Sequence, residues 1–284
     1  FPGQAGIEGE AAEAHDPRDD IDFLEDELDM WYLGILEKGI ERFESKYHGA
    51  DASIEADLAE QMSAFRTNED EIKQIILSEG LDLDPTTWDE ADREALAREI
   101  RKRTKPMVIA ANKVDDPAAA ENFADIASDP AYDHLPIVPT SAHAEKALKA
   151  ADEAGRVDYT PGDDDFDLVG DVSEEQEAGL EQIRSLLDDH DGTGVQSSLE
   201  AALFDALDLI AVFPGSDDGS TSEKGSFRDC FLLPEGSTTE DFANHIHTDL
   251  GNGLLHGIDC RSSRQIGGGH VLDDRDVIEL VTTT

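Results

Sequence analysis

The sequence is poor in cysteine. Cys230 and Cys260 are its only two cysteines in 284 residues, and neither belongs to a CxxC pair. So low a count excludes a disulfide-stabilised scaffold, and the missing CxxC pairs exclude a cysteine-based zinc site. This usage fits a reducing, cytoplasmic compartment, and we expect no metal site of this kind in the chain.

Long apolar runs are missing as well. The longest one, residues 207–213, is interrupted by Asp208 and is far shorter than the roughly 20 residues that cross a bilayer. The sequence also has no basic start followed by an apolar segment and a small-residue cleavage site, so we expect neither a membrane partner nor a secretion signal. Hydrophobic residues still make up 38% of the chain, which is enough for the cores of two or three units.

Basic residues are scarce, with 22 Lys and Arg against 67 Asp and Glu and a net charge of −45. At molar salt the Debye length falls to about 3 Å, so self-repulsion in such a chain would be screened. We interpret the charge as adaptation to a salt-rich cytoplasm. The alternative is an acidic surface that binds basic partners. Either interpretation argues against DNA as a partner.

Helical periodicity dominates residues 21–104, after a loop rich in Gly, Pro and acidic residues at 1–20. A first long helix is expected from residue 21. Three more are expected around 54–65, around 72–76 with Thr67 as a cap, and from a Thr87 cap to about 103. Residues 21–104 are therefore expected to form a helical insertion, with Trp31, Phe43 and Phe65 in its core. The apolar stripe of the first helix is expected to comprise Leu24, Leu28, Trp31, Ile35, Leu36, Ile40 and Phe43.

The period changes after Lys105. Residues 106–111 form a short apolar run typical of a strand buried on both faces of a parallel sheet, and residues 136–140 are a second candidate strand. Helices are expected at 117–128, 143–153, 173–188 with Ser173 as cap, and 195–207. This alternation predicts α/β architecture over residues 105–210.

Residues 211–284 have a different texture. Short β-like runs at 230–233, 254–260 and 277–281 are separated by Gly-rich turns. They predict a separate small α+β domain.

The motif Asn112-Lys113-Val114-Asp115 directly follows the first predicted strand, where an open α/β sheet presents its ligand contacts. A carboxylate has two acceptor oxygens side by side, which match the adjacent N1 and 2-amino donors of guanine but not the N1 lone pair of adenine. We therefore assign base recognition to Asp115. Asn112 can brace the loop and donate to the base, and Lys113 can lay its methylene stem along the purine face.

Ser141 and Ala142 follow the second predicted strand. Ser141 can hold the loop, and the backbone amide of Ala142 can donate to the guanine carbonyl. The dipeptide is uninformative alone, but its position after the next strand supports the first motif. The alternative is that both segments are ordinary surface loops.

The sequence has no GxxxxGK[ST] phosphate loop. Residues 219–226 imitate one, but Gly225 follows Lys224 where Ser or Thr is needed. Residues 251–257 fail the dinucleotide pattern because His256 stands in place of the third glycine. Without phosphate and magnesium ligands, we expect no catalytic residues in this chain and no nucleotide hydrolysis by it alone.

Several strings resemble the archaeal form of the YchF/Obg-like GTPase family, of the TRAFAC class. The similarity extends over most of the chain and is carried by residues 15–17, 20–24, 101–115, 192–196, 233–238 and 246–251. It implies a P-loop GTPase fold with an inserted helical subdomain and a C-terminal β-grasp-like TGS domain. For this chain we expect an α/β fold: a partial Ras-like sheet, the inserted helical subdomain and the TGS domain. Since the sequence starts at Phe1, we expect the N-terminal phosphate-binding half to lie outside it.

The resemblance also implies function. Relatives whose base motif ends in glutamate prefer ATP, so Asp115 predicts GTP, with Mg2+ held by the absent half and hydrolysis by the intact protein. A TGS domain implies contact with the ribosome or RNA, for which Lys224, Arg228, Arg261 and Arg264 are the candidates. The rival hypothesis is a non-enzymatic ribosome- or RNA-binding adaptor with a residual nucleotide site. A TGS domain from a synthetase or stringent-response enzyme is a third possibility, but the sequence has no catalytic signature of either.

Overall fold

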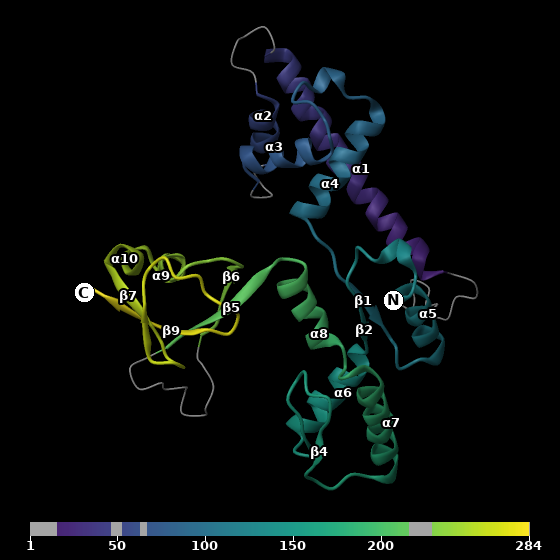
Figure 1. The fold of residues 1–284 in the computed structure, drawn as a ribbon. Helices are drawn as coiled ribbons and strands as arrows, with labels where there is room; N and C mark the ends of the chain where they lie inside the picture. Colours follow the sequence, from purple (N-terminus) through teal and green to yellow (C-terminus); the bar gives the residue numbers. More distant parts are fainter. Residues whose placement is uncertain (1–15, 47–52, 63–66, 216–228, 284) are drawn as a thin grey trace. The chain divides into compact units, whose positions relative to one another are not determined.

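The computed structural model describes residues 16–46, 53–62, 67–215 and 229–283 (Figure 1). Internal contacts divide the chain into two compact units, residues 1–198 and 199–284, and each is described by itself. No helix in these described ranges is both long and apolar enough to cross a bilayer.

Four helices begin the first unit: α1 (Pro17–Lys46), α2 (Ile54–Gln61), α3 (Glu69–Ser78) and α4 (Glu90–Thr104). They pack together as a bundle (Figure 1). The buried face of α1 is formed by Tyr32, Leu36, Ile40 and Phe43. Their spacing of four, four and three residues is the pattern of an amphipathic helix. The bundle core includes Tyr32, Leu36, Ile40 and Phe43 from α1 with Leu58, Ile72, Ile76, Leu96 and Ile100 from the others.

The structure corrects the expected start and inner face of the first helix. It begins at Pro17 instead of residue 21, because Asp16 accepts a hydrogen bond from the Arg18 backbone amide at 3.0 Å and Pro17 suits the first helical position. Phe43 is buried as predicted, but Trp31 is 50% exposed. Trp31 instead packs edge-on against Tyr32 and under the Lys105 ammonium. Phe65 lies outside the described residues.

Two helix caps also differ from the predictions. Asn68 caps α3 in place of Thr67, and Asp89 caps α4 in place of Thr87. Each observed cap forms a reciprocal capping box, with Glu71 and Asp92 respectively, and so satisfies two backbone donors at once. Thr87 instead ends a short 3-10 turn, η2 (Pro85–Thr87).

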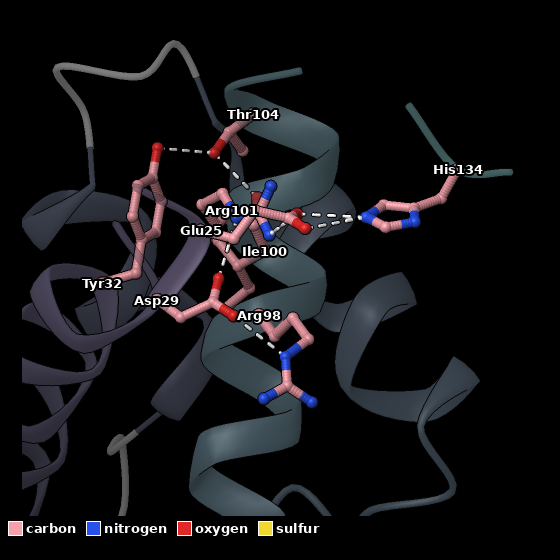
Figure 2. A network of polar contacts seen from close by, with 8 residues as sticks. All are labelled: Glu25, Asp29, Tyr32, Arg98, Ile100, Arg101, Thr104 and His134. Atoms are coloured by element: carbon pink, nitrogen blue, oxygen red, sulfur yellow. Dashed lines mark hydrogen bonds and ion pairs between the residues drawn. The ribbon is translucent and has the colours of Figure 1, made fainter. Parts of the chain in front are cut away.

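A buried ion-pair network joins α4 to α1 (Figure 2). Arg101 is only 2% exposed and donates from Nε to Asp29 and from Nη2 to Glu25, both at 2.8 Å. Arg98 also pairs with Asp29 at 2.9 Å, and His134 lies 3.1 Å from Glu25. Glu25 therefore contacts both the helical bundle and the segment that leads into strand β2.

The α/β part contains β1 (Ile109–Asn112) and β2 (Ile137–Thr140), which pair in parallel. Helices α5 (Pro117–Ala127) and α6 (Ala142–Glu153) follow them, as predicted. β1 starts three residues later than predicted and is not buried on both faces, because Ala110 is exposed while Ala111 is buried. In the described residues this sheet has two strands.

A short hairpin and a long helix complete the first unit. Strands β3 (Val157–Asp158) and β4 (Asp167–Leu168) pair antiparallel. Helix α7 (Glu174–His190) has Ser173 as its N-cap, as predicted. The helix predicted for residues 195–207 is α8 (Val195–Glu200), continued by a π-helical turn, η4 (Ala201–Asp205).

In its described residues the second unit has a five-stranded sheet in the order β6-β5-β9-β7-β8. Its strands are β5 (Leu209–Pro214), β6 (Phe231–Pro234), β7 (Leu254–Asp259), β8 (Arg264–Ile266) and β9 (Val277–Thr282). Helices α9 (Thr239–Ile246) and α10 (Thr248–Gly253) lie between β6 and β7 in the chain. The predicted strands β6, β7 and β9 are confirmed, whereas β5 and β8 were not predicted. Val212, Leu233, Phe242 and Ile278 form the core.

Candidate functional site

The two loops singled out in the sequence lie side by side at one edge of the β1–β2 sheet. The strands are parallel and Asn112 is in register with Thr140, so the residues that follow each strand emerge at the same edge. This is the edge at which open α/β sheets bind ligands. The structure therefore brings together all five residues predicted to recognise a base.

Asn112 ties the two loops to each other. Its Oδ1 accepts a hydrogen bond from the Lys113 amide at 2.9 Å and another from the Ala142 amide at 3.1 Å. Within the described part of the chain Asn112 uses only this oxygen, so its two Nδ2 donors remain for a ligand. The predicted bracing role of Asn112 thus has a specific geometry.

Lys113 adopts a backbone conformation that is uncommon for a non-glycine residue. Its φ is 72°, in the left-handed region. The Asn112 side chain and the hydrogen bond from the Asp116 amide to the Lys113 carbonyl, at 2.9 Å, stabilise this bend. Such conformations are found where a site needs a defined loop shape, and here the bend exposes the Lys113 side chain.

Ser141 holds Asp115. The fully buried Ser141 is the N-cap of α6, where its Oγ accepts from the Ala144 amide at 3.1 Å and donates to Asp115 Oδ1 at 2.6 Å. Asp115 itself is exposed. Both residues line one end of a groove of about 860 Å³ that runs along α6 and α7. The carboxylate is therefore fixed in orientation and accessible.

The arrangement suits a guanine base. Asp115 can accept from N1–H and the 2-amino group with lone pairs that the Ser141 bond does not use. The single hydrogen of the Ala142 amide is already used, because it is donated to Asn112 Oδ1. Its predicted bond to the guanine carbonyl requires that this hydrogen be shared or exchanged.

The sequence reasoning missed a third segment, residues 192–198, that supports the Ser141 loop. The Ser141 amide donates to the Thr193 carbonyl at 2.8 Å, and Thr193 Oγ1 donates to Glu145 at 2.8 Å. Tyr159 also donates to Glu145, at 2.8 Å, and burial together with this carboxylate raises the pKa of Tyr159 to about 12. The only signal in the sequence was the Gly-Thr-Gly string at 192–194, which carries no chemistry of its own.

The described part of the second unit contains two of the four cations predicted to contact RNA or the ribosome. Arg261 lies in the turn between β7 and β8, and Arg264 begins β8; both are exposed. Arg261 also donates to the Arg275 carbonyl at 2.7 Å. Lys224 and Arg228 lie outside the described residues. In the described residues no cluster of three or more His, Cys, Asp or Glu could hold a metal ion.

Comparisons with known proteins show similarity over most of the chain. Residues 110–217 match the family model described as "Obg-like GTPase YGR210-like, G4 motif-containing domain", and residues 218–282 match the TGS domain. The uncharacterized GTP-binding protein MJ1332 of Methanocaldococcus jannaschii is 34% identical over 99% of this chain and 70% of its own length. A GTP-binding protein of Schizosaccharomyces pombe, C428.15, is 27% identical over 83% of this chain and 60% of its own length.

A solved structure extends the similarity to the fold. The crystal structure of a GTP binding protein from Pyrococcus horikoshii OT3 matches with a TM-score of 0.78 and 34% identity, over 99% of this chain and 76% of the other. Sequence and fold thus agree over almost the whole chain. The chain belongs to the Obg-like family of GTP-binding proteins, of the YGR210-like type with a G4-motif domain followed by a TGS domain.

Proposed function

We propose that this chain recognises the guanine base of GTP and GDP. The observation that supports this most strongly is the hydrogen bond from buried Ser141 to exposed Asp115, at 2.6 Å. It orients a carboxylate at the strand edge where its free lone pairs match the two adjacent donors of guanine. Asn112, Lys113 and Ala142 complete the site: Asn112 donates to the base, Lys113 covers its face and the Ala142 amide takes the carbonyl oxygen.

Hydrolysis of GTP is proposed for the complete gene product. The sequence here has no GxxxxGK[ST] motif, and catalysis of phosphoryl transfer depends on positioning the phosphates and Mg2+. Both would have to be held by residues outside this chain. When bound, Mg2+ would neutralise charge on the phosphates, while the residues described above hold the base.

Binding of guanine and adenine nucleotides to the complete gene product tests the proposal. In molar KCl, which the net charge of −45 favours, we expect GDP to bind at least about 100-fold more tightly than ADP, because adenine presents an acceptor to Asp115 and leaves it unpaired. Isothermal titration with both nucleotides measures the ratio. Equal affinities would contradict guanine recognition. Absence of any nucleotide binding would favour the rival adaptor function.

We further propose that the TGS domain contacts the ribosome or another RNA. Arg261 and Arg264 lie on one exposed hairpin, and paired cations on a surface turn can contact phosphates despite the overall negative charge. Reversing both, as Arg261→Glu with Arg264→Glu, should reduce co-sedimentation with ribosomes in high KCl by several-fold.

The control for this experiment has the same change in net charge at another place. Lys38→Glu with Lys73→Glu alters two exposed lysines of the helical bundle and should leave co-sedimentation unchanged. If both double variants sediment like the unaltered protein, the two arginines make no such contact. If both lose binding equally, net charge decides and the hairpin has no special role.

A further inference from the structure

The segment at residues 192–198 makes three contacts with the base loop, which comprises residues 140–142 at and after the end of β2. The Thr193 carbonyl accepts from the Ser141 amide at 2.8 Å. Thr140, the last residue of β2, has its Oγ1 3.5 Å from the Gly194 carbonyl and 3.1 Å from Ser198 Oγ. Ser198 itself donates to the Gly194 carbonyl at 2.7 Å. This segment thus holds Thr140 and Ser141, the two residues that precede Ala142.

Gly194 has no room for a side chain. Its φ is +75°, and a Cβ placed on it would lie 1.7 Å from the carbonyl oxygen of Pro139 in β2. Such a distance is far inside van der Waals contact. The close approach of this turn to β2 therefore depends on glycine, for both backbone conformation and space.

Thr193 is anchored from its other side by a buried carboxylate. Thr193 and Glu145 are both buried, and Glu145 Oε2 accepts from Thr193 Oγ1 and from Tyr159 OH, each at 2.8 Å. Glu145 lies one turn after Ser141 on α6, and the Glu145 amide bonds to the Ser141 carbonyl at 3.2 Å. Helix α6, the β3 strand end and the 193 turn are thereby locked to one another, and hydrogen bonds to an ionised acceptor are the stronger kind.

We infer that Thr193 and Gly194 are positioning residues of the nucleotide site, which fix the Ser141-Ala142 loop against β2 so that Ser141 holds the Asp115 carboxylate in place for the guanine base and the Ala142 amide stays within reach of it. This inference rests on the proposed guanine recognition. Neither residue touches the base, and their effect passes through Ser141 and Thr140.

Replacing Thr193 tests the inference in the complete gene product. Thr193→Val keeps the shape of the side chain but removes the hydroxyl that bonds to Glu145, and should lower GDP affinity about tenfold. Thr193→Ser keeps the hydroxyl and should restore affinity to within about twofold. Inorganic triphosphate, a competitor that has no base, should bind the unaltered protein, Thr193→Val and Thr193→Ser equally. The inferred role of Thr193 is confined to the base loop, which triphosphate would not contact.

Gly194→Ala supplies a second measurement, with Gly80→Ala as its matched control. The two glycines have nearly the same φ, +75° and +74°, but a Cβ at Gly80 would meet nothing within 4 Å. We expect Gly194→Ala to weaken GDP binding by more than tenfold and Gly80→Ala to leave it unchanged. Far-UV circular dichroism checks that each variant is folded.

The outcomes separate the two hypotheses. If the unaltered protein fails to bind GDP, the proposed function falls, and the inference with it. If it binds GDP but Thr193→Val and folded Gly194→Ala bind equally well, only the positioning role is overturned. A parallel loss of GDP and triphosphate binding, or a loss in Thr193→Val that serine does not restore, also overturns it, because the effect would then be general.

Discussion

Asp115→Asn is expected to change the preferred base of this protein from guanine to xanthine. A carboxylate presents two acceptors, whereas an amide presents one acceptor and one donor. Guanine would then meet a donor at its 2-amino group, while the 2-carbonyl of xanthine would meet a donor that fits. Because a hydrogen bond to a charged group contributes about 1.5–3 kcal/mol, losing the bond to the 2-amino group and weakening the bond to N1–H should reduce GDP affinity by roughly 100-fold, with a gain for xanthosine diphosphate.

The local geometry makes this substitution informative. Ser141 Oγ donates to Asp115 Oδ1 at 2.6 Å, and an asparagine oxygen can accept the same bond. The loop should therefore keep its shape while the chemistry that faces the base changes. Asp115→Ala, in contrast, removes both the bond to Ser141 and the acceptors that face the base, and should weaken the binding of GDP and of xanthosine diphosphate.

Asp116→Asn is the matched control for the Asp115 variant. Asp116 is the adjacent residue and is also exposed, but it acts as the N-cap of α5, where its carboxylate accepts from the Ala118 amide at 2.8 Å. Asparagine is an equally good cap, so base preference should not change. Competition with GDP and xanthosine diphosphate measures all three variants. If Asp115→Asn keeps the guanine preference of the unaltered protein, another group recognises the base.

The proximity of the two loops in the proposed base site was predictable to the extent that it is local. Asn112 and Asp115 follow one strand directly, and Ser141 and Ala142 follow the next. A parallel pair brings two such segments to the same edge, so strand periodicity and motif together predicted their proximity. Thr193 and Gly194 are far along the chain from β2, and nothing in their own sequence indicates that they pack there. Only the tertiary structure shows that contact.

The helical bundle shows a similar limit. The apolar pattern of α1 predicted a helix correctly, yet it contains more apolar residues than one face can hold. Tyr32 and Leu36 face the other helices, while Trp31 is half exposed. Periodicity predicts the helix but does not decide which of these apolar residues face inward, because the choice depends on where α2 and α4 pack. The caps moved by one or two residues for a related reason, since several residues with capping side chains compete at each helix start.

Arg101→Met is expected to destabilise the first unit by about 3–5 kcal/mol, the usual effect of removing one partner from a buried ion pair. Arg101 is 2% exposed and bonds to Glu25 and Asp29 (Figure 2). Burial lowers the pKa of Arg101, but its hydrogen bonds to Asp29 and Glu25 outweigh this, and the net pKa is raised. Methionine fills much of the same volume but leaves two carboxylates near each other without their shared cation.

Two further variants separate the ion pair from the loss of packing. Arg103→Met, on the same helix, removes a cation that is 46% exposed and pairs with Glu99, and should cost less than about 1 kcal/mol. Adding Glu25→Gln and Asp29→Asn to Arg101→Met should recover part of the stability, because the two carboxylates that lost their shared cation are then neutral. Denaturant unfolding in molar KCl measures each free energy. Equal losses for Arg101→Met and Arg103→Met would mean that the network in Figure 2 contributes little more than a surface pair. A larger loss for Arg101→Met, relieved by the triple change, would show that α1 and α4 are held together by this buried charge.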